Sequence, residues 1–288
     1  MNTGNRCNSF TQDMIKKLFP GFLILEFLSL VVFGQNTEIH YGDNPKAGKY
    51  YTVRGIKIYT EVYGSGKPLL LIHGNGGSIN SFSGTIPYFS KKYKVIAADS
   101  RAQGKTVDSG DSLSFEMMAD DFAALLTEMN VDSAYVIGWS DGGINAILLA
   151  MRHPEKLIRL VSTGANMTPD SSAIRPTDWL ESRKYYETTR NKIFTSAKEK
   201  NDWKLFMLDW LQPNVSLPEL RGVRCPSLII CGDRDIITIE HTKGIYAHIP
   251  NAFLWVVPNS GHGTLVEHRD EFNKMVDGFF DPAFARQP

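Results

Sequence analysis

Cysteine is scarce in this sequence, with three residues in 288, and the few present exclude two kinds of site. No cysteines and histidines lie at the short spacings that metal ligands need, so we expect no metal and no other cofactor. Cys225 and Cys231 lie six residues apart on one predicted strand, about 20 Å when extended. A disulfide requires Cα atoms within about 7 Å, so these two residues cannot bridge each other.

Net charge is also absent, because 31 lysines and arginines balance 31 aspartates and glutamates. A chain without a global positive field does not attract nucleic acid or an anionic membrane surface. We therefore expect a small-molecule substrate and no nucleic-acid partner. With 42% hydrophobic residues, the chain is long enough for one large core and too short for two ordinary enzyme domains.

A long apolar run occurs near the amino terminus, at residues 18–33, directly after two lysines. Basic residues, an apolar stretch and small residues at a cleavage point form the pattern of a secretory signal peptide. We expect residues 1–34 to be this signal, or an extended leader plus the signal if translation starts at Met14, and residues 35–49 to be a tail. The protein would then be periplasmic or secreted, without stable membrane insertion after cleavage.

An uncleaved membrane anchor at residues 18–33 is the alternative interpretation. The run is shorter than the about 20 apolar residues of a spanning helix, and it contains Pro20 and Glu26. The signal peptide is therefore the favoured interpretation.

Residues 50–288 carry the pattern of an α/β domain. We expect a hairpin from Tyr50 to Tyr63 that turns at Arg54 and Gly55, after which apolar runs of strand length alternate with helical patterns. These runs are residues 69–72, 95–98, 134–137, 157–161, 227–231 and 252–257. Such alternation predicts a mostly parallel central sheet with helices on both faces.

The alternation breaks once, at about residues 166–221, where strand signals vanish and prolines and aromatic residues gather. We interpret this insertion as a small helical cap over the strand ends. One helix of the cap is expected to start near Asn201, with four residues at the spacing of a single helix face: Trp203, Phe206, Met207 and Trp210. That face either packs on the core or lines a substrate pocket.

The pattern Gly-Trp-Ser-Asp-Gly at residues 138–142 follows a strand-like run and precedes a helix-like stretch at 144–151. A strand that turns sharply into a helix forces a strained backbone on the middle residue, and flanking glycines let the two elements approach. The serine hydroxyl is then lifted clear of the sheet. This context favours a nucleophile at Ser140 over an ordinary Gly/Ser turn.

A serine nucleophile needs a base and a carboxylate that holds the base. His262 lies on a glycine-flanked turn after one late strand-like run, and Asp233 and Asp235 follow another. The order serine, aspartate, histidine along the chain matches an α/β-hydrolase, and not chymotrypsin-like or subtilisin-like enzymes. From spacing alone, either aspartate suits the acid position.

A glycine-rich loop at residues 73–78 supplies the next requirement of acyl transfer. The reaction creates an oxyanion, and a backbone N–H aimed at it is typically worth about 2.7–4 kcal/mol. We assign the donors to the N–H groups of Asn75 and Asp141, the latter because it follows the nucleophile. His73 is then a buried hydrogen-bonding residue that shapes the loop.

Five segments together resemble the α/β-hydrolase superfamily over nearly all of residues 50–280. They are His-Gly-Asn-Gly-Gly-Ser at 73–78, Asp-Ser-Arg-Ala-Gln-Gly at 99–104, Gly-Trp-Ser-Asp-Gly-Gly at 138–143, Gly-Asp-Arg-Asp at 232–235 and Gly-His at 261–262. The resemblance implies the α/β-hydrolase fold. It also implies that Asp235, at the last position of a Gly-x-x-Asp turn, is the catalytic acid. Asp233 is then a loop charge or a partner for Arg234. Ala102 stands where the family has a glycine, which affects only the conformation of that loop.

Ser140 argues against the epoxide hydrolase and haloalkane dehalogenase branches, which need a carboxylate nucleophile, so ester-like bonds are the expected substrates. The carboxylate of Asp141, one residue from the nucleophile, would bind a substrate ammonium and repel a carboxylate. Alternatively, Asp141 only occupies the favourable first turn of the helix that begins there. Trp139 and Gly74 are further expected substrate contacts.

Residues 138–144, Gly-Ala-Asn at 164–166 and residues 270–274 resemble the biphenyl-hydrolase-like branch of the superfamily. In that branch an aspartate after the serine holds the amino group of an α-amino acid ester, and the resemblance implies this role for Asp141. The predicted export signal departs from that branch. The expected activity is hydrolysis of small carboxylic esters, including α-amino acid esters, through an acyl-enzyme. Two alternatives stay open: a lactone or carbon–carbon bond hydrolase, and a non-catalytic binding protein with the same fold.

Overall fold

The computed structural model describes residues 39–284, which belong to one compact unit with its own core. The predicted signal peptide at residues 1–34 lies outside the described residues, as do the first residues of the predicted tail. Among residues 39–284, no helix combines the length and the apolar character needed to span a membrane.

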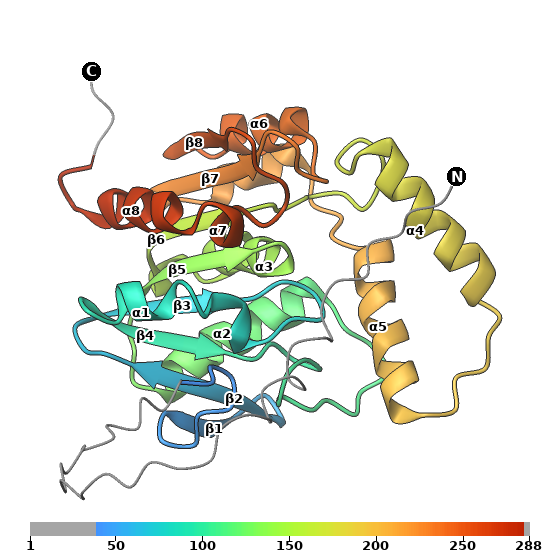
Figure 1. Cartoon of the computed structure of the whole chain (residues 1–288), viewed down its shortest axis with the longest axis horizontal. Helices are drawn as coiled ribbons and strands as arrows, with labels where there is room; N and C mark the ends of the chain where they lie inside the picture. The colour runs from blue at the N-terminus through green and yellow to red at the C-terminus, as the bar shows by residue number, and fades with distance from the viewer. Residues whose placement is uncertain (1–38, 285–288) are drawn as a thin grey trace, which may run out of the picture. The chain divides into compact units, whose positions relative to one another are not determined.

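Eight strands form one sheet in the order β1-β2-β4-β3-β5-β6-β7-β8 (Figure 1). They are β1 Gly48–Val53, β2 Ile56–Tyr63, β3 Lys67–Ile72, β4 Tyr93–Ala98, β5 Ala134–Trp139, β6 Leu157–Thr163, β7 Ser227–Gly232 and β8 Ala252–Val257. β2 pairs antiparallel with both β1 and β4, and the other pairings are parallel. Each predicted strand run lies within one of these strands, so the mostly parallel sheet is confirmed.

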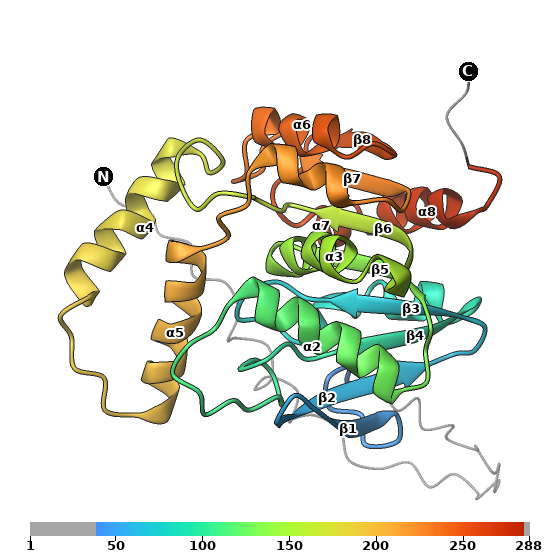
Figure 2. The same cartoon turned by 180° about the vertical axis from the view of Figure 1, so that it is seen from behind.

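Helices cover both faces of the sheet, as the alternation predicted (Figures 1 and 2). One face carries α2 Phe115–Glu128, α3 Asp141–Arg152 and α6 Ile239–His248, and the other carries α1 Ile86–Phe89, α7 Thr264–Glu267 and α8 Arg269–Phe280. The short 3-10 helices η1 Ile79–Phe82 and η2 Pro154–Lys156 complete this part. On β3, Leu70 and Ile72 belong to the first core, and Leu69 and Leu71 to the second. Because both faces are buried, the strands are continuous apolar runs.

The insertion between β6 and β7 contains α4 Pro176–Thr189, α5 Ala197–Leu211 and the 3-10 helix η3 Leu217–Gly222. α4 and α5 lie beside the sheet and on neither of its faces (Figures 1 and 2). The side chain of Asn201 on α5 donates to the carbonyl of Ala102 at 2.8 Å, which ties the cap to a loop that follows β4.

The predicted start of α5 near Asn201 was wrong by one helical turn. The helix begins at Ala197 because Ser196 and Glu199 form a capping box in front of it. The side-chain oxygen of Ser196 accepts from the Glu199 N–H, and the Glu199 carboxylate accepts from the Ser196 N–H. The capping box satisfies two backbone N–H groups at the start of the helix. The spacing of the aromatic residues, which begins at Trp203, gives no sign of this start.

Aromatic side chains join α4 to α5. Tyr186 stacks on Trp210 with 4.9 Å between ring centroids, and Tyr185 meets Phe206 edge-on at 4.7 Å. The buried side chains of α5 are Leu205 and Leu208. The aromatic face of α5 therefore packs mainly on α4, its neighbour in the cap. This differs from both expected roles, which were packing on the core and lining a substrate pocket.

Candidate active site

Ser140 stands at a sharp turn between β5 and α3. Its backbone has φ of 57° and ψ of −121°, a conformation that residues with a side chain rarely adopt. A Cβ atom on Gly138 would lie 2.0 Å from the carbonyl oxygen of Gly142, and one on Gly142 would lie 1.9 Å from that of Ile72. Neither position admits a side chain, and the glycines thus let the strand and the helix approach.

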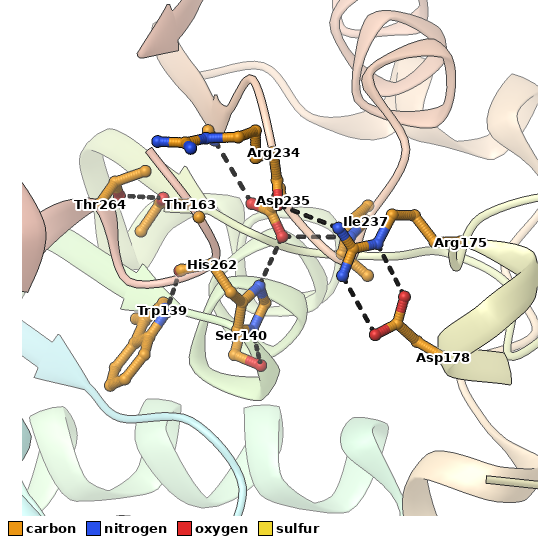
Figure 3. Close-up of polar contacts among 12 residues, drawn as sticks. Trp139, Ser140, Thr163, Arg175, Asp178, Arg234, Asp235, Ile237, His262 and Thr264 are labelled. Atoms are coloured by element: carbon orange, nitrogen blue, oxygen red, sulfur yellow. Dashed lines mark hydrogen bonds and ion pairs between the residues drawn. The ribbon is translucent and has the colours of Figure 1, made fainter. Parts of the chain in front are cut away.

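A chain of hydrogen bonds links Ser140, His262 and Asp235 (Figure 3). Nε2 of His262 lies 2.9 Å from Oγ of Ser140, and Nδ1 lies 2.7 Å from Oδ1 of Asp235. With the Asp235 carboxylate as acceptor, Nδ1 carries the proton and Nε2 is free to accept the hydroxyl proton. The three residues follow the ends of β5, β7 and β8, which lie at the same edge of the sheet.

The two candidate aspartates have different surroundings. Asp235 is 4% exposed and accepts hydrogen bonds from the N–H groups of Ile237 at 3.0 Å and Gly232 at 3.4 Å. The side chain of Asp233 is 40% exposed and accepts from the N–H of Ser260 at 3.0 Å. The structure therefore brings Asp235, and not Asp233, to His262.

Two neighbours hold His262 in position. The indole N–H of Trp139 donates to the carbonyl oxygen of His262 at 2.9 Å (Figure 3). Gly164 has φ of 67°, and a Cβ atom there would lie 2.8 Å from Cε1 of His262. Trp139, an expected substrate contact, thus also fixes the loop that carries the histidine.

The glycine-rich loop passes close to the serine. A Cβ atom on Gly74 would lie 2.9 Å from Cβ of Ser140. His73 is buried: its Nε2 accepts from the N–H of Ser100 at 3.0 Å, so its Nδ1 carries the proton and donates to the carbonyl of Gly74 at 2.8 Å. Burial lowers the pKa of His73 to about 4, so the ring is neutral at physiological pH.

Asn75, an expected oxyanion donor, also connects the loop to the cap. Its side-chain Nδ2 donates to the carbonyl oxygen of Leu205 on α5 at 3.1 Å. On the next residue, the N–H of Gly76 donates to the side chain of Gln103 at 2.7 Å. The loop beside Ser140 is therefore bonded to two other segments of the chain.

The structure places Asp209 of α5 against Asp141. Asp141 is 4% exposed, and its carboxyl lies next to the carboxyl of Asp209 and near the side chain of Asn75, whose Nδ2 donates to the carbonyl of Leu205. Burial first, and the charge of Asp209 second, raise the pKa of Asp141 well above its usual value. Asp209 as a residue is exposed to solvent, but the protein groups packed around its carboxyl desolvate it and raise its pKa to about 6. Two carboxyls this close share a proton when nothing else lies between them.

Sequence reasoning missed Asp209, because no motif marks it among the many charged residues of the cap. One signal was available. Asp209 lies four residues after Leu205 and directly after Leu208, so it continues the side of α5 on which both leucines are buried. Asp209 itself is exposed to solvent, so this spacing places it at the edge of the buried side of α5.

A groove of about 660 Å³ lies elsewhere, between residues 108–113 and α5. Neither Ser140 nor Asp141 lines it. Within residues 39–284, no group of three or more histidine, cysteine, aspartate or glutamate side chains is arranged to hold a metal ion.

The chain is similar in sequence to several known hydrolases. The model of a family described as "alpha/beta hydrolase fold" matches residues 67–202. The serine hydrolase BPHL of Mus musculus is 28% identical over 249 residues, which cover 79% of this chain and 84% of that protein. The putative carbamate hydrolase RutD of Serratia proteamaculans (strain 568) is 25% identical over 254 residues, which cover 77% of this chain and 95% of that protein.

A solved structure gives the same result. The meta-cleavage product hydrolase from Pseudomonas fluorescens IP01 superposes with a TM-score of 0.69 at 25% identity, covering 84% of this chain and 100% of that one. These relatives are hydrolases, and they match the fold over most of the described residues. The chain therefore has the α/β-hydrolase fold and is a hydrolase.

Proposed function

We propose that this protein is a serine hydrolase that cleaves small carboxylic esters, with Ser140 as nucleophile, His262 as general base and Asp235 as the acid. The observation that carries the proposal is the continuous chain of two hydrogen bonds, 2.9 Å and 2.7 Å long, from the serine to the buried carboxylate. This chain activates a hydroxyl that has little nucleophilicity by itself.

The reaction proceeds in two halves. His262 takes the hydroxyl proton as Oγ of Ser140 attacks the ester carbonyl, and Asp235 stabilises the imidazolium that forms. The N–H groups of Asn75 and Asp141 hold the oxyanion. The imidazolium then protonates the leaving alcohol, which gives an acyl-enzyme. His262 next deprotonates a water molecule, which attacks the acyl carbon, releases the acid and restores Ser140.

Within this class, α-amino acid esters are the substrates that the site fits best. The carboxyl of Asp141 is buried next to Ser140, and its Oδ2 has no hydrogen-bond donor among the described residues. An ammonium group on the α carbon of a bound ester would supply such a donor together with the opposite charge. The alternative role of Asp141, a favourable charge in the first turn of α3, does not account for its contact with Asp209.

A lactone or carbon–carbon bond hydrolase is the second candidate. The names of some relatives support this candidate. One of them is the 2-hydroxymuconate semialdehyde hydrolase of Pseudomonas sp. (strain CF600), which is 24% identical to this chain. A substrate that carries a carboxylate would meet Asp141 and Asp209, and it would need a cation to compensate. The groups that perturb these two carboxyls are Asn75, His262 and one another, with no lysine or arginine among them.

The catalytic assignment is tested with purified variants. We expect Ser140→Ala to lower kcat for a small ester by roughly 10⁴–10⁶-fold, as triad dissections do. Asp235→Asn should lower it by about 10⁴-fold, because it destabilises the productive tautomer of His262, while Asp233→Asn should stay within about twofold of wild type. The reverse ranking of the two aspartates would move the acid to Asp233.

A serine-reactive phosphonate separates an enzyme from a non-catalytic binding protein of the same fold. It should label wild type at Ser140 and leave Ser140→Ala unlabelled. No labelling of folded wild type would favour a binding protein.

A further inference from the structure

We infer that Asp209 is the second half of an ammonium clamp, in which one carboxylate from the core and one from the cap hold the α-ammonium group of an ester substrate. This inference deepens the proposed function and rests on it. It makes Asp209 a specificity-determining residue, and it gives the cap a direct part in recognising the substrate.

The position of the pair suits an α-amino group. The α-nitrogen of an amino acid ester is two bonds from the carbonyl carbon, so its anchor must lie next to the nucleophile. Asp141 is the residue after Ser140, and Asp209 contacts Asp141. Asp209 also lies near enough to His262 for a charge on the imidazole to lower the pKa of its carboxyl. The pair therefore borders the place where an ester carbonyl would meet Oγ of Ser140.

One hydrogen bond sets the position of Asp209. Leu205 and Asp209 are four residues apart on α5, which places them on the same side of the helix one turn apart. The carbonyl of Leu205 accepts from Nδ2 of Asn75, whose own backbone belongs to the loop beside Ser140. The same contact that holds the loop thus holds Asp209 over Asp141.

The pair lacks a donor that only a ligand can supply. Asp141 is 4% exposed with an oxygen that no described donor reaches, whereas Asp209 is solvent-exposed, so a ligand reaches the pair from the side of Asp209. Carboxylates only accept hydrogen bonds, and a primary ammonium offers three N–H donors and a positive charge. An N-acylated amine offers one donor and no charge. The clamp therefore selects a free amine.

Binding of an ammonium replaces the proton that the two carboxyls share in the free protein. The groups that face the pair are Asn75, which does not titrate, and His262. The proton leaves to solvent, the ammonium keeps its own three protons, and no covalent bond changes. Amine binding should thus be accompanied by proton release.

The test compares kcat/KM for a free α-amino acid benzyl ester with kcat/KM for its N-acetylated twin. Wild type should prefer the free amine by about 30-fold or more, and Asp141→Ala should lose that preference. Asp209→Asn should reduce the preference by about 10-fold to 100-fold, and Asp209→Glu should restore part of it. The N-acetylated ester reports any general damage to the site, because it enters the ratio as the reference.

Asp202→Asn is the matched control. Asp202 lies on the same helix, its side chain is 53% exposed, and it pairs with Lys198 at 2.6 Å. This variant should keep the wild-type preference. A preference in Asp209→Asn within about twofold of wild type would overturn the clamp while leaving Asp141 and the proposed function in place. Equal rates of wild type on both esters would overturn the clamp and the amino acid ester substrate together, and hydrolysis of both would still support an esterase.

Calorimetry adds a readout that damage to packing does not produce. Ser140→Ala binds the benzylamide of the same amino acid without turnover, and the heat of binding is measured in two buffers of different ionisation enthalpy. We expect proton release, and we expect Asp209→Asn in the same background to abolish it. No proton release by Ser140→Ala on binding the amide would overturn the exchange of a shared proton for an ammonium.

Discussion

Each residue in the hydrogen-bonded chain at the site is positioned by a neighbour outside that chain. Asp235 accepts from the backbone N–H of Ile237, and His262 is held through its carbonyl by the indole of Trp139. The strained turn at Ser140 fixes the serine itself. Groups held in this way before a substrate arrives need little reorganisation during the reaction.

His73 gives a pH prediction at the residue scale. Burial lowers its pKa to about 4, whereas an unfolded histidine has a pKa of about 6.5. The stabilisation from the neutral ring is therefore complete above about pH 6.5 and is lost as the pH falls to about 4. Urea unfolding should show about 2 kcal/mol of this loss between pH 7.5 and 5.0.

His73→Gln removes this titration and should flatten the pH dependence of unfolding by the same amount. His40 is exposed and serves as the control, since His40→Gln should keep the wild-type pH dependence. An identical pH dependence in His73→Gln and wild type would contradict the assignment of a neutral buried ring.

At the scale of elements, the cap begins against the loop that carries the acid. Ile174 pairs with Ile237 in an antiparallel bridge, and the N–H of Arg175 donates to the carbonyl of Ile236 at 2.8 Å. Ile237 is also the residue whose N–H holds Asp235. The start of the cap and the orientation of the acid thus depend on the same short segment.

The contact between α3 and β3 gives a prediction at this scale. In Gly142→Ala, the new Cβ atom would lie 1.9 Å from the carbonyl oxygen of Ile72, and backbone cannot yield as a flexible side chain does. We expect a loss of about 3 kcal/mol or more in the free energy of unfolding, with weaker phosphonate labelling in the protein that still folds. Urea unfolding and labelling measure the two effects.

Gly278→Ala is the matched control on α8, because a Cβ atom there meets nothing within 4 Å. It should gain about 0.5–1 kcal/mol, since alanine favours a helix over glycine. Equal stability of the two variants would show that the elbow glycine is not needed for close approach.

At the scale of the whole described unit, a buried carboxylate joins the segment before the first strand to the sheet. Glu61 on β2 is fully buried and accepts from the N–H groups of Gly42 and Asn44, each at 2.8 Å. The hydroxyls of Tyr59 and Tyr63 donate to the same carboxylate at 2.9 Å and 2.7 Å. Four donors on one carboxylate make residues 42–44 part of the folded unit.

Glu61→Gln should weaken this connection. An amide keeps the shape but presents an NH₂ group to donors, so at least one buried donor loses its acceptor. We expect about 1–3 kcal/mol less stability in urea and faster proteolysis between residues 39 and 47. Glu128→Gln, at an exposed position of α2, should change neither measurement. Unchanged proteolysis in Glu61→Gln would show that the segment is held by other contacts.

Much of this architecture could be predicted from local patterns. Strands that are buried on both faces appear as short apolar runs, so the runs at residues 69–72 and 134–137 located β3 and β5. The start of α5 was misplaced, because the capping box at Ser196 lies outside the aromatic periodicity. The signal peptide and the role of Asp141 remain predictions.

The sequence by itself determined the α/β class and the candidates Ser140, Asp235 and His262, because strand ends and glycine turns are encoded within a few neighbouring residues. Spacing alone left Asp233 and Asp235 open, since both follow the same strand, and only the family resemblance pointed to Asp235; the tertiary structure brings Asp235 to His262. The tertiary structure also decided that Asp209 lies next to Asp141. The two residues belong to separate helices, and no local sequence pattern shows which cap helix packs beside the nucleophile.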